Sequence, residues 1–299
     1  MANLKEIRNR IASVGSTMQI TSAMKMVSAA KLKKAQDAIT AMRPYSEKLT
    51  ELLQNLSATL ESDSGSSFAQ QREVNKVLVV AITSNRGLAG AFNTNIIKAS
   101  KALKDETYTG KQVDFITIGK KGDDIISKDG NVIEFNAAIY DDLSFKASSV
   151  IAEMLMEKYD QGAYDKIVLV YNHFKNAATQ IVMKEQFLPI LPPEQTQTTN
   201  AVDYIFEPTK PEIVEGLIPK SLKTQLFKAI RDSVASEHGA RMTAMHKATD
   251  NATEMRDALK LQYNKARQAA ITNEILEIVG GAEALAGYCL LYTSDAADE

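Results

Sequence analysis

The sequence predicts an α/β protein in which two long helices, one near each end of the chain, flank an inserted domain of alternating strands and helices. Three observations carry this prediction. Apolar positions recur in alternating steps of three and four over residues 4–60 and again after Pro219, as is typical of coiled-coil helices. Between residues 74 and 207 the pattern changes to short continuous apolar runs. Helices of these lengths would extend on the order of 85 and 100 Å, too far for a compact domain, so we expect them to pair as an antiparallel coiled coil.

Residues 1–60 are predicted to form the N-terminal helix of this pair. Pro44 should bend or interrupt it, because proline removes a backbone donor and clashes with the preceding turn. The serine-rich stretch that follows, within residues 61–73, is predicted to be a linker. The seam positions are Leu4, Ile7, Ile11, Val14, Met18, Thr21, Ala35, Ile39, Met42, Tyr45, Leu49, Leu53, Leu56 and Leu60.

Residues 74–207 are predicted to form the inserted domain. Its apolar runs predict strands at 77–82, 113–118, 166–171, 179–187 and 202–206. Helices are expected over 91–103 and 145–159. Strands that alternate with helices at this spacing indicate a parallel sheet covered by helices, which is a Rossmann-like arrangement.

Residues 208–285 complete the coiled coil, with a helix that we expect to begin at Lys220. Its seam uses small and flexible side chains, and aromatic residues are rare in both long helices. Such a seam indicates either a thin rod that slides against a partner or an ordinary structural coiled coil. Its positions are Met245, Ala248, Ala252, Met255, Leu259, Ala266 and Ala269.

Composition excludes several kinds of site. The single cysteine, Cys289, provides neither a disulfide framework nor a cysteine metal site. We find no run of about 18 apolar residues and no signal segment, so we expect a protein that stays where it is made. The net charge is -2, yet seven of the first 36 residues are basic and one is acidic. This stretch is either a solvated helix face or a surface for an acidic partner or a phosphate backbone.

The strongest candidate for chemistry is the loop at residues 84–90 (SNRGLAG), between a predicted strand and a predicted helix. Phosphate-binding loops occupy this place, but the loop lacks both the full dinucleotide pattern and the P-loop pattern. We therefore expect Gly87 and Gly90 to serve a tight turn and close packing. Gly119 and Gly122 are likewise expected to form a turn. The histidines have no metal-ligand spacing, and no nucleophile has a partner base.

Three long motifs resemble those of F-type ATP synthase gamma subunits. The opening helix carries residues 4–14 (LKEIRNRIASV) and 19–27 (QITSAMKMV), and the loop region carries residues 82–93 (ITSNRGLAGAFN). The far end carries residues 236–237 (SE), 240–245 (ARMTAM), 248–252 (ATDNA) and 264–274 (NKARQAAITNE). The likeness covers residues 1–285 in order.

The resemblance implies a central stalk subunit that rotates inside a hexamer of alpha and beta chains and couples transmembrane ion flow to ATP synthesis or hydrolysis. It implies no catalytic site and no cofactor in this chain. The implied partners are the alpha, beta and epsilon (delta-type) chains and the ring of c subunits, with no nucleic acid. The implied place is the cytoplasmic side of a bacterial inner membrane, with attachment through the ring.

By the same resemblance, residues near the two chain ends would face mobile loops of beta chains, and we expect the segments around Met24 and Arg267 to lie side by side. Another group would lie at the foot, against polar loops of the ring. The first group comprises Met24, Arg267, Gln268, Thr272 and Glu274, and the second comprises Arg43, Tyr45, Tyr204 and Glu207.

Two departures from the family matter. The chain lacks the cysteine-bearing insertion of plant-type relatives, so thiol control is not expected. Residues 286–299 break the helical pattern, so we expect no function for this tail, which is suspected to be an artefact of sequence assembly or cloning.

Two rival functions stay open at this point. One is a dinucleotide-binding enzyme with a coiled-coil oligomerisation arm, which would bind a nucleotide tightly. The other is a nucleic-acid or scaffold coiled coil, whose affinity for a duplex would fall steeply with salt.

Overall fold

The computed structural model describes residues 4–58, 68, 71–190 and 210–295. The chain divides into two compact units, one formed by Met1–Met24 and Met245–Glu299 and the other by Lys25–Ala244. Helix α1 (Leu4–Ala58) and helix α5 (Lys210–Asp295) each contribute to both units.

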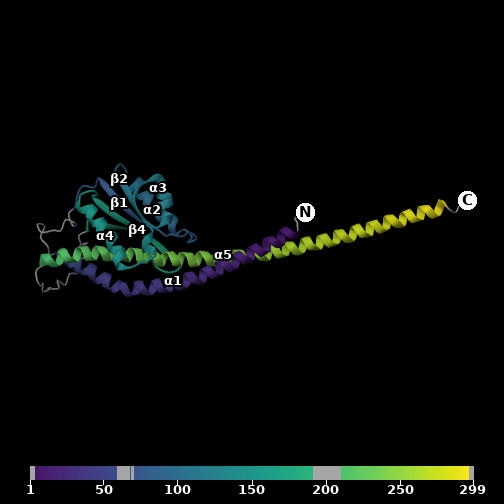
Figure 1. Cartoon of the computed structure of the whole chain (residues 1–299), viewed down its shortest axis with the longest axis horizontal. Coiled ribbons are helices and arrows are strands. Elements are labelled where there is room, and N and C mark those ends of the chain that lie inside the picture. Colours follow the sequence, from purple (N-terminus) through teal and green to yellow (C-terminus); the bar gives the residue numbers. More distant parts are fainter. Residues whose placement is uncertain (1–3, 59–67, 69–70, 191–209, 296–299) are drawn as a thin grey trace. The chain divides into compact units, whose positions relative to one another are not determined.

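The larger unit contains a five-stranded sheet in the order β3-β2-β1-β4-β5 (Figure 1). Strands β1 to β4 are parallel, and β5 returns antiparallel to β4. The strands are β1 (Lys76–Ile82), β2 (Gln112–Ile118), β3 (Asn131–Asn136), β4 (Lys166–Phe174) and β5 (Gln180–Leu188). The short helices are α2 (Phe92–Ala102), which continues as a π-helical turn (Leu103–Thr107), α3 (Lys120–Asp129), a 3-10 turn (Ala138–Tyr140) and α4 (Phe145–Asp160).

Helices cover both faces of this sheet. Alternate strand residues point to opposite sides, so each face has its own set of apolar side chains to bury. In β1, Val77, Val79 and Ala81 pack against α2 and α3. Leu78, Val80 and Ile82 face the other way, against α4 and the Ile218–Ile230 part of α5. The central strand is therefore buried on both faces, which explains its continuous apolar sequence.

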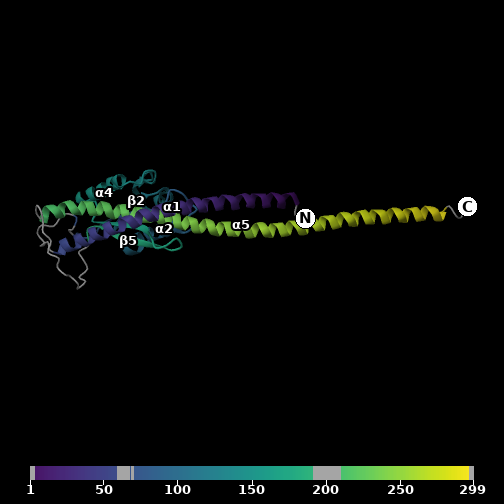
Figure 2. The same ribbon diagram turned by 90° about the horizontal axis from the view of Figure 1, so that it is seen from below.

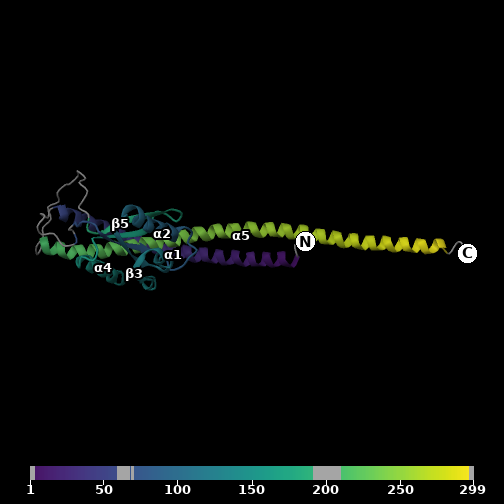
Figure 3. The ribbon, with the colours of Figure 1, turned by 90° about the horizontal axis from the view of Figure 1, so that it is seen from above.

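The smaller unit is an antiparallel helix pair (Figures 2 and 3). The Thr249 hydroxyl donates to the Thr21 hydroxyl (2.8 Å), and the Thr253 hydroxyl donates to the Met18 sulfur (3.4 Å). Nearer the chain ends, the Arg8 guanidinium donates to the Tyr263 hydroxyl (2.8 Å). Small and flexible side chains fill this seam, as the sequence predicts.

Most predicted elements are confirmed, including four of the five strands and the long antiparallel helices. Strand β3 and helix α3 were not predicted, and the predicted turn at Gly119 to Gly122 is wrong because α3 begins at Lys120. Helix α5 begins at Lys210, ten residues before its predicted start, and continues to Asp295, past its predicted end. Helix α1 runs through Pro44 without a break, and the alternative that Pro44 bends it stays a prediction. The predicted strand at 202–206 and most of the predicted linker lie outside the described residues.

Three seam positions are also wrong, since Tyr45, Met255 and Ala269 are exposed. Tyr45 is 49% exposed, whereas its neighbour Ser46 is buried. The seam therefore moves by one residue after Met42 and continues through Leu49, which is buried as predicted.

Candidate functional site

The loop between β1 and α2 lies at the carboxyl edge of the sheet, where the chain order reverses between β1 and β4. Ligands of open α/β sheets bind at this reversal point. The loop is therefore the first place to test for a small-molecule site.

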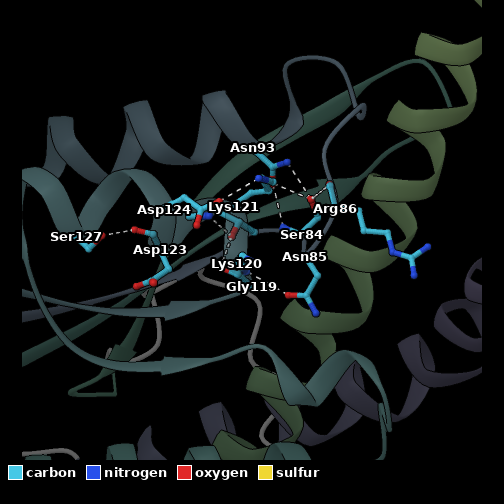
Figure 4. A network of polar contacts seen from close by, with 12 residues as sticks. Ser84, Asn85, Arg86, Asn93, Gly119, Lys120, Lys121, Asp123, Asp124 and Ser127 are labelled. Carbon is cyan, nitrogen blue, oxygen red and sulfur yellow. Dashed lines mark hydrogen bonds and ion pairs between the residues drawn. The ribbon is translucent and has the colours of Figure 1, made fainter.

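Polar contacts fix this loop to the start of α2 (Figure 4). The Ser84 backbone N–H donates to Asn93 Oδ1 (2.9 Å), and the Ser84 hydroxyl donates to the Arg86 carbonyl (2.7 Å). Asn93 lies in the first turn of α2, so the helix and the loop hold each other in place.

The first turn of α3 uses its backbone donors within the chain. The Lys120 N–H donates to Asn85 Oδ1 (3.1 Å), the Lys121 N–H to the Ser84 carbonyl (3.0 Å), and the Gly122 N–H to the Thr83 hydroxyl (2.9 Å). Free N–H groups at a helix start are what a bound phosphate requires. A phosphate here would have to displace these three bonds, so the geometry favours a structural role over a nucleotide site.

Close packing explains the second glycine pair. A Cβ added to Gly119, whose φ is +104°, would lie 2.3 Å from the Thr83 carbonyl oxygen, and one added to Gly122 would lie 2.7 Å from the Thr83 hydroxyl. In the first pair, Gly90 has φ +59° and serves the turn, whereas a Cβ on Gly87 would meet open space. Gly87 is therefore not needed for packing, contrary to the sequence-based expectation.

Helix α5 packs directly against this loop through a buried ion pair that the sequence analysis did not single out. Arg241 donates to the carbonyls of Arg86 (3.1 Å) and Gly87 (3.3 Å) and pairs with Glu237 at 2.6 Å. The side chains of Arg241 and Glu237 are 9% and 11% exposed. Their spacing of four residues was the available signal, because it places both on one helix face.

Burial shapes the ionisation of this region. Desolvation raises the pKa of Glu237, and the Arg241 charge opposes this in part. Desolvation lowers the pKa of the neighbouring His238 to about 4, so its imidazole is neutral at pH 7. Within the described residues, no cluster of three or more His, Cys, Asp or Glu side chains is arranged to hold a metal ion.

The predicted beta-facing residues of α5 lie toward its carboxyl end, and the helix extends past the start of α1 (Figures 2 and 3). Arg267, Gln268, Thr272 and Glu274 are all exposed, and the Thr272 hydroxyl donates to the Gln268 carbonyl (2.9 Å). We call residues 271–285 the free end of α5. Its large apolar side chains, between 48% and 75% exposed, are Ile271, Ile275, Leu276, Ile278, Val279 and Leu285.

The expected proximity of Met24 and Arg267 is wrong. The pairing of Thr21 with Thr249 places Met24 beside the region of residue 247. Arg267 lies about 20 residues further along α5, or about 30 Å at the rise of an α-helix. The helices pair in a register in which Arg8 and Tyr263 are opposite each other, so Arg267 lies near the start of α1.

The four predicted foot residues are only partly described. Arg43 is half-buried and donates to the Phe174 carbonyl (3.3 Å), while Tyr45 is exposed. Tyr204 and Glu207 lie outside the described residues. The role of all these side chains as partner contacts stays a prediction.

These features together define a class of protein. A long helix pair carries an α/β domain whose ligand edge is filled by its own helix, and one helix end is left without a partner in the described chain. Exposed apolar side chains at a helix end are typical of a surface that contacts another protein.

Comparison with known proteins narrows this class. A family model described as ATP synthase matches residues 3–285. The ATP synthase gamma chain of Flavobacterium psychrophilum is 71% identical to this chain over 96% of its length and 100% of the relative. That of Flavobacterium johnsoniae is 72% identical with the same coverage. The chain therefore belongs to the ATP synthase gamma chain family.

Solved structures support the fold. A chain of the Euglena gracilis mitochondrial ATP synthase (OSCP, F1 and c-ring, rotational state 3) matches with a TM-score of 0.68 at 21% identity, over 94% of each chain. A chain from the central stalk and c-ring of the Tetrahymena thermophila enzyme matches with a TM-score of 0.57 at 25% identity, over 77% of this chain and 99% of that one.

Proposed function

We propose that the chain is the rotating central stalk of an F-type ATP synthase and that it couples transmembrane ion flow to ATP synthesis or hydrolysis. The observation that carries this proposal, beside family membership, is the free end of α5. Its side chains from Ile271 to Leu285 are exposed although many of them are large and apolar. Contiguous exposed apolar surface of this kind marks a site of protein contact.

The spacing of apolar and charged residues in the free end indicates what kind of partner surface it can contact. Ile271, Ile275, Ile278 and Leu285 follow steps of four, three and seven, so they share one face of the helix. Arg267 and Glu274 are four residues before Ile271 and Ile278, so they lie on the same face. A partner can therefore meet an apolar stripe together with charges that form and break bonds as the helix turns.

The proposed partners follow from this arrangement and from the family. A head of alternating alpha and beta chains would enclose the free end, and the epsilon chain and the c-ring would contact the foot. Within the described ranges, no helix has the length and apolar character that a membrane crossing requires. Attachment to the cytoplasmic side of a bacterial inner membrane would come through the c-ring.

We also propose that the chain is not catalytic. The first three backbone donors of α3, at the sheet edge, are used by Asn85, Ser84 and Thr83. The nucleotide chemistry would belong to the partner chains, and this chain would transmit work between them and the ring.

The test is reconstitution of the complex in membrane vesicles with and without this chain. We expect the chain to co-purify with alpha and beta chains, and we expect ATP hydrolysis to drive ion uptake only when it is present. Ion uptake at the normal rate without the chain would refute the proposal. Full hydrolysis without uptake would support it, because the catalytic and coupling roles would then be separated.

A further inference from the structure

One face of α5 meets the β4–β5 hairpin through polar or minimal side chains. The positions are Gln225, Asp232, Ser236, Gly239 and Thr243, at steps of seven, four, three and four. These steps keep them on a single helix face. A helix that packs on a sheet normally buries an apolar stripe. A polar face at this position therefore indicates a role other than simple burial.

Each position touches a particular part of the hairpin. Gln225 donates to Glu185 Oε1 (2.7 Å), whose other oxygen accepts from the Tyr171 hydroxyl (2.6 Å). The Ser236 hydroxyl donates to the Asn172 carbonyl (2.9 Å). The contacts therefore fasten successive points of both strands to the helix.

The far end of the hairpin is fastened in the same way. The Thr243 hydroxyl donates to the Ala177 carbonyl (3.2 Å). Gly239 lets the turn approach closely, because a Cβ there would lie 3.2 Å from the same carbonyl oxygen. The hairpin thus follows α5 from Gln225 to Thr243.

The central contact joins Asp232 to His173 of β4. Asp232 Oδ2 lies 2.8 Å from His173 Nδ1, and the Asp232 side chain is 1% exposed. Among the described residues, its other oxygen, Oδ1, has no hydrogen-bond partner. A buried carboxylate with one unsatisfied oxygen costs stability, and the best-attested benefit of such buried polar groups is a fixed register.

The sequence around Asp232 supports this interpretation. If α5 slid along the hairpin by one turn, about 5.4 Å, His173 would face Ala229 or Ser236. Neither residue has a carboxylate, so only one axial position gives His173 a carboxylate partner. An apolar seam of Ala and Ile would tolerate the same slip much better.

We propose that His173 and Asp232 form a register pin, which holds the β4–β5 hairpin at one axial position on α5. Torque carried by α5 then reaches the α/β domain without slip. This inference rests on the proposed function, and it assigns the two side chains a positioning role in coupling.

The test uses the assembled complex in vesicles, with His173→Ala, His173→Lys and Asp232→Asn. The His173 side chain is 34% exposed, so its truncation leaves no large cavity in the core. The matched control is His246→Ala, which removes an exposed pair with Asp250 (3.3 Å) on the same helix. The readouts are amide hydrogen exchange in β4 and β5 and the ratio of ions pumped to ATP hydrolysed.

We expect His173→Ala and Asp232→Asn to accelerate exchange at residues 171–174 and 181–185 by about tenfold or more, because the hairpin then opens locally. The pumping ratio should fall while the hydrolysis rate stays at the wild-type level. His173→Lys should restore both readouts, because the lysine ammonium again provides a hydrogen-bond donor to Asp232. His246→Ala should change neither.

Three results would overturn the pin. These are unchanged exchange in both disruptive variants, faster exchange with a wild-type pumping ratio, and failure of His173→Lys to restore the ratio. None of them touches the proposed function, which fails only if vesicles without the chain pump normally.

Discussion

The ion pair between Glu237 and Arg241 allows the most direct test of how α5 is held against the sheet edge. In Arg241→Gln, Glu237 keeps its buried position but loses its cation, and the carbonyls of Arg86 and Gly87 lose a charged donor. Breaking a buried pair from one side costs about 3 to 5 kcal/mol. Both side chains are still about a tenth exposed. We therefore expect the free energy of unfolding to fall by about 3 kcal/mol, the lower end of this range.

The loss should depend on pH in a defined direction. Burial raises the pKa of Glu237, and removal of Arg241 removes the main influence that lowers it. A carboxyl with a raised pKa binds more protons in the folded chain than in the unfolded chain, so its contribution to stability is present at low pH and is lost as the pH rises. The defect of Arg241→Gln should therefore be largest near about pH 8 and smaller near about pH 5.

Urea unfolding of the isolated full-length chain, followed by circular dichroism, measures this effect. The control is the double variant Glu237→Gln with Arg241→Gln, which carries no buried charge and should recover much of the lost stability. A loss below about 1 kcal/mol at the higher pH, or a loss that grows as the pH falls, would refute the reasoning.

Four further predictions concern the sites described above. Replacing Arg267 and Glu274 together with Ala should leave assembly intact, since both side chains are exposed. The double variant should alter the hydrolysis rate or weaken coupling, because each lost contact is worth about 1.5 to 3 kcal/mol if a partner buries it. Wild-type rates of hydrolysis and pumping would show that the two residues play no part in the mechanism. The isolated chain should not bind ATP, and micromolar binding by calorimetry would contradict this. Deleting residues 286–299, which lie beyond the family match, should change neither assembly nor ATPase activity, and a large activity loss would show a structural tail. Gly119→Ala should destabilise the chain to urea by about 2 kcal/mol or more, whereas Gly87→Ala, at a position with open space, should have little effect.

Much of the fold could be predicted from local pattern. The strand β1 reads as a continuous apolar run because helices cover both of its faces, and the long helices show their seams directly. The strand that was not predicted from pattern lacks a continuous apolar run. Strand β3 lies at the edge of the sheet, where exposed Ile133 and Phe135 alternate with partly buried residues and the apolar run is broken.

Helix α3 begins beside two glycines that suggest a turn in the sequence. Gly119 and Gly122 resemble a turn, because glycine disfavours helices. The structure requires them for another reason, since Thr83 leaves no room for a Cβ at either position. That requirement comes from a residue more than 30 positions away, so no local pattern could reveal it.

The site was predictable only in part. The exposure of Arg267 and Glu274 agrees with the expected outward direction, and the beta-chain contacts inferred from the resemblance stay predictions. The pairing of Met24 with Arg267 failed because helix register depends on which seam residues meet, as Thr21 and Thr249 do. Sequence spacing alone leaves that register open.

Two side chains attach α5 to the α/β domain, and they lie on different sides of the helix. Their placement affects how α5 could transmit torque. Asp232 holds the β4–β5 hairpin, and Arg241 holds the loop after β1. They are nine residues apart, which at about 100° per residue puts them about 180° apart around the helix. A helix fastened on one side can roll against its support, whereas a helix fastened on opposite sides cannot turn about its own axis without breaking one attachment. In related folds the carboxyl edge of the sheet binds a ligand, whereas here the loop after β1 at that edge holds helix α5.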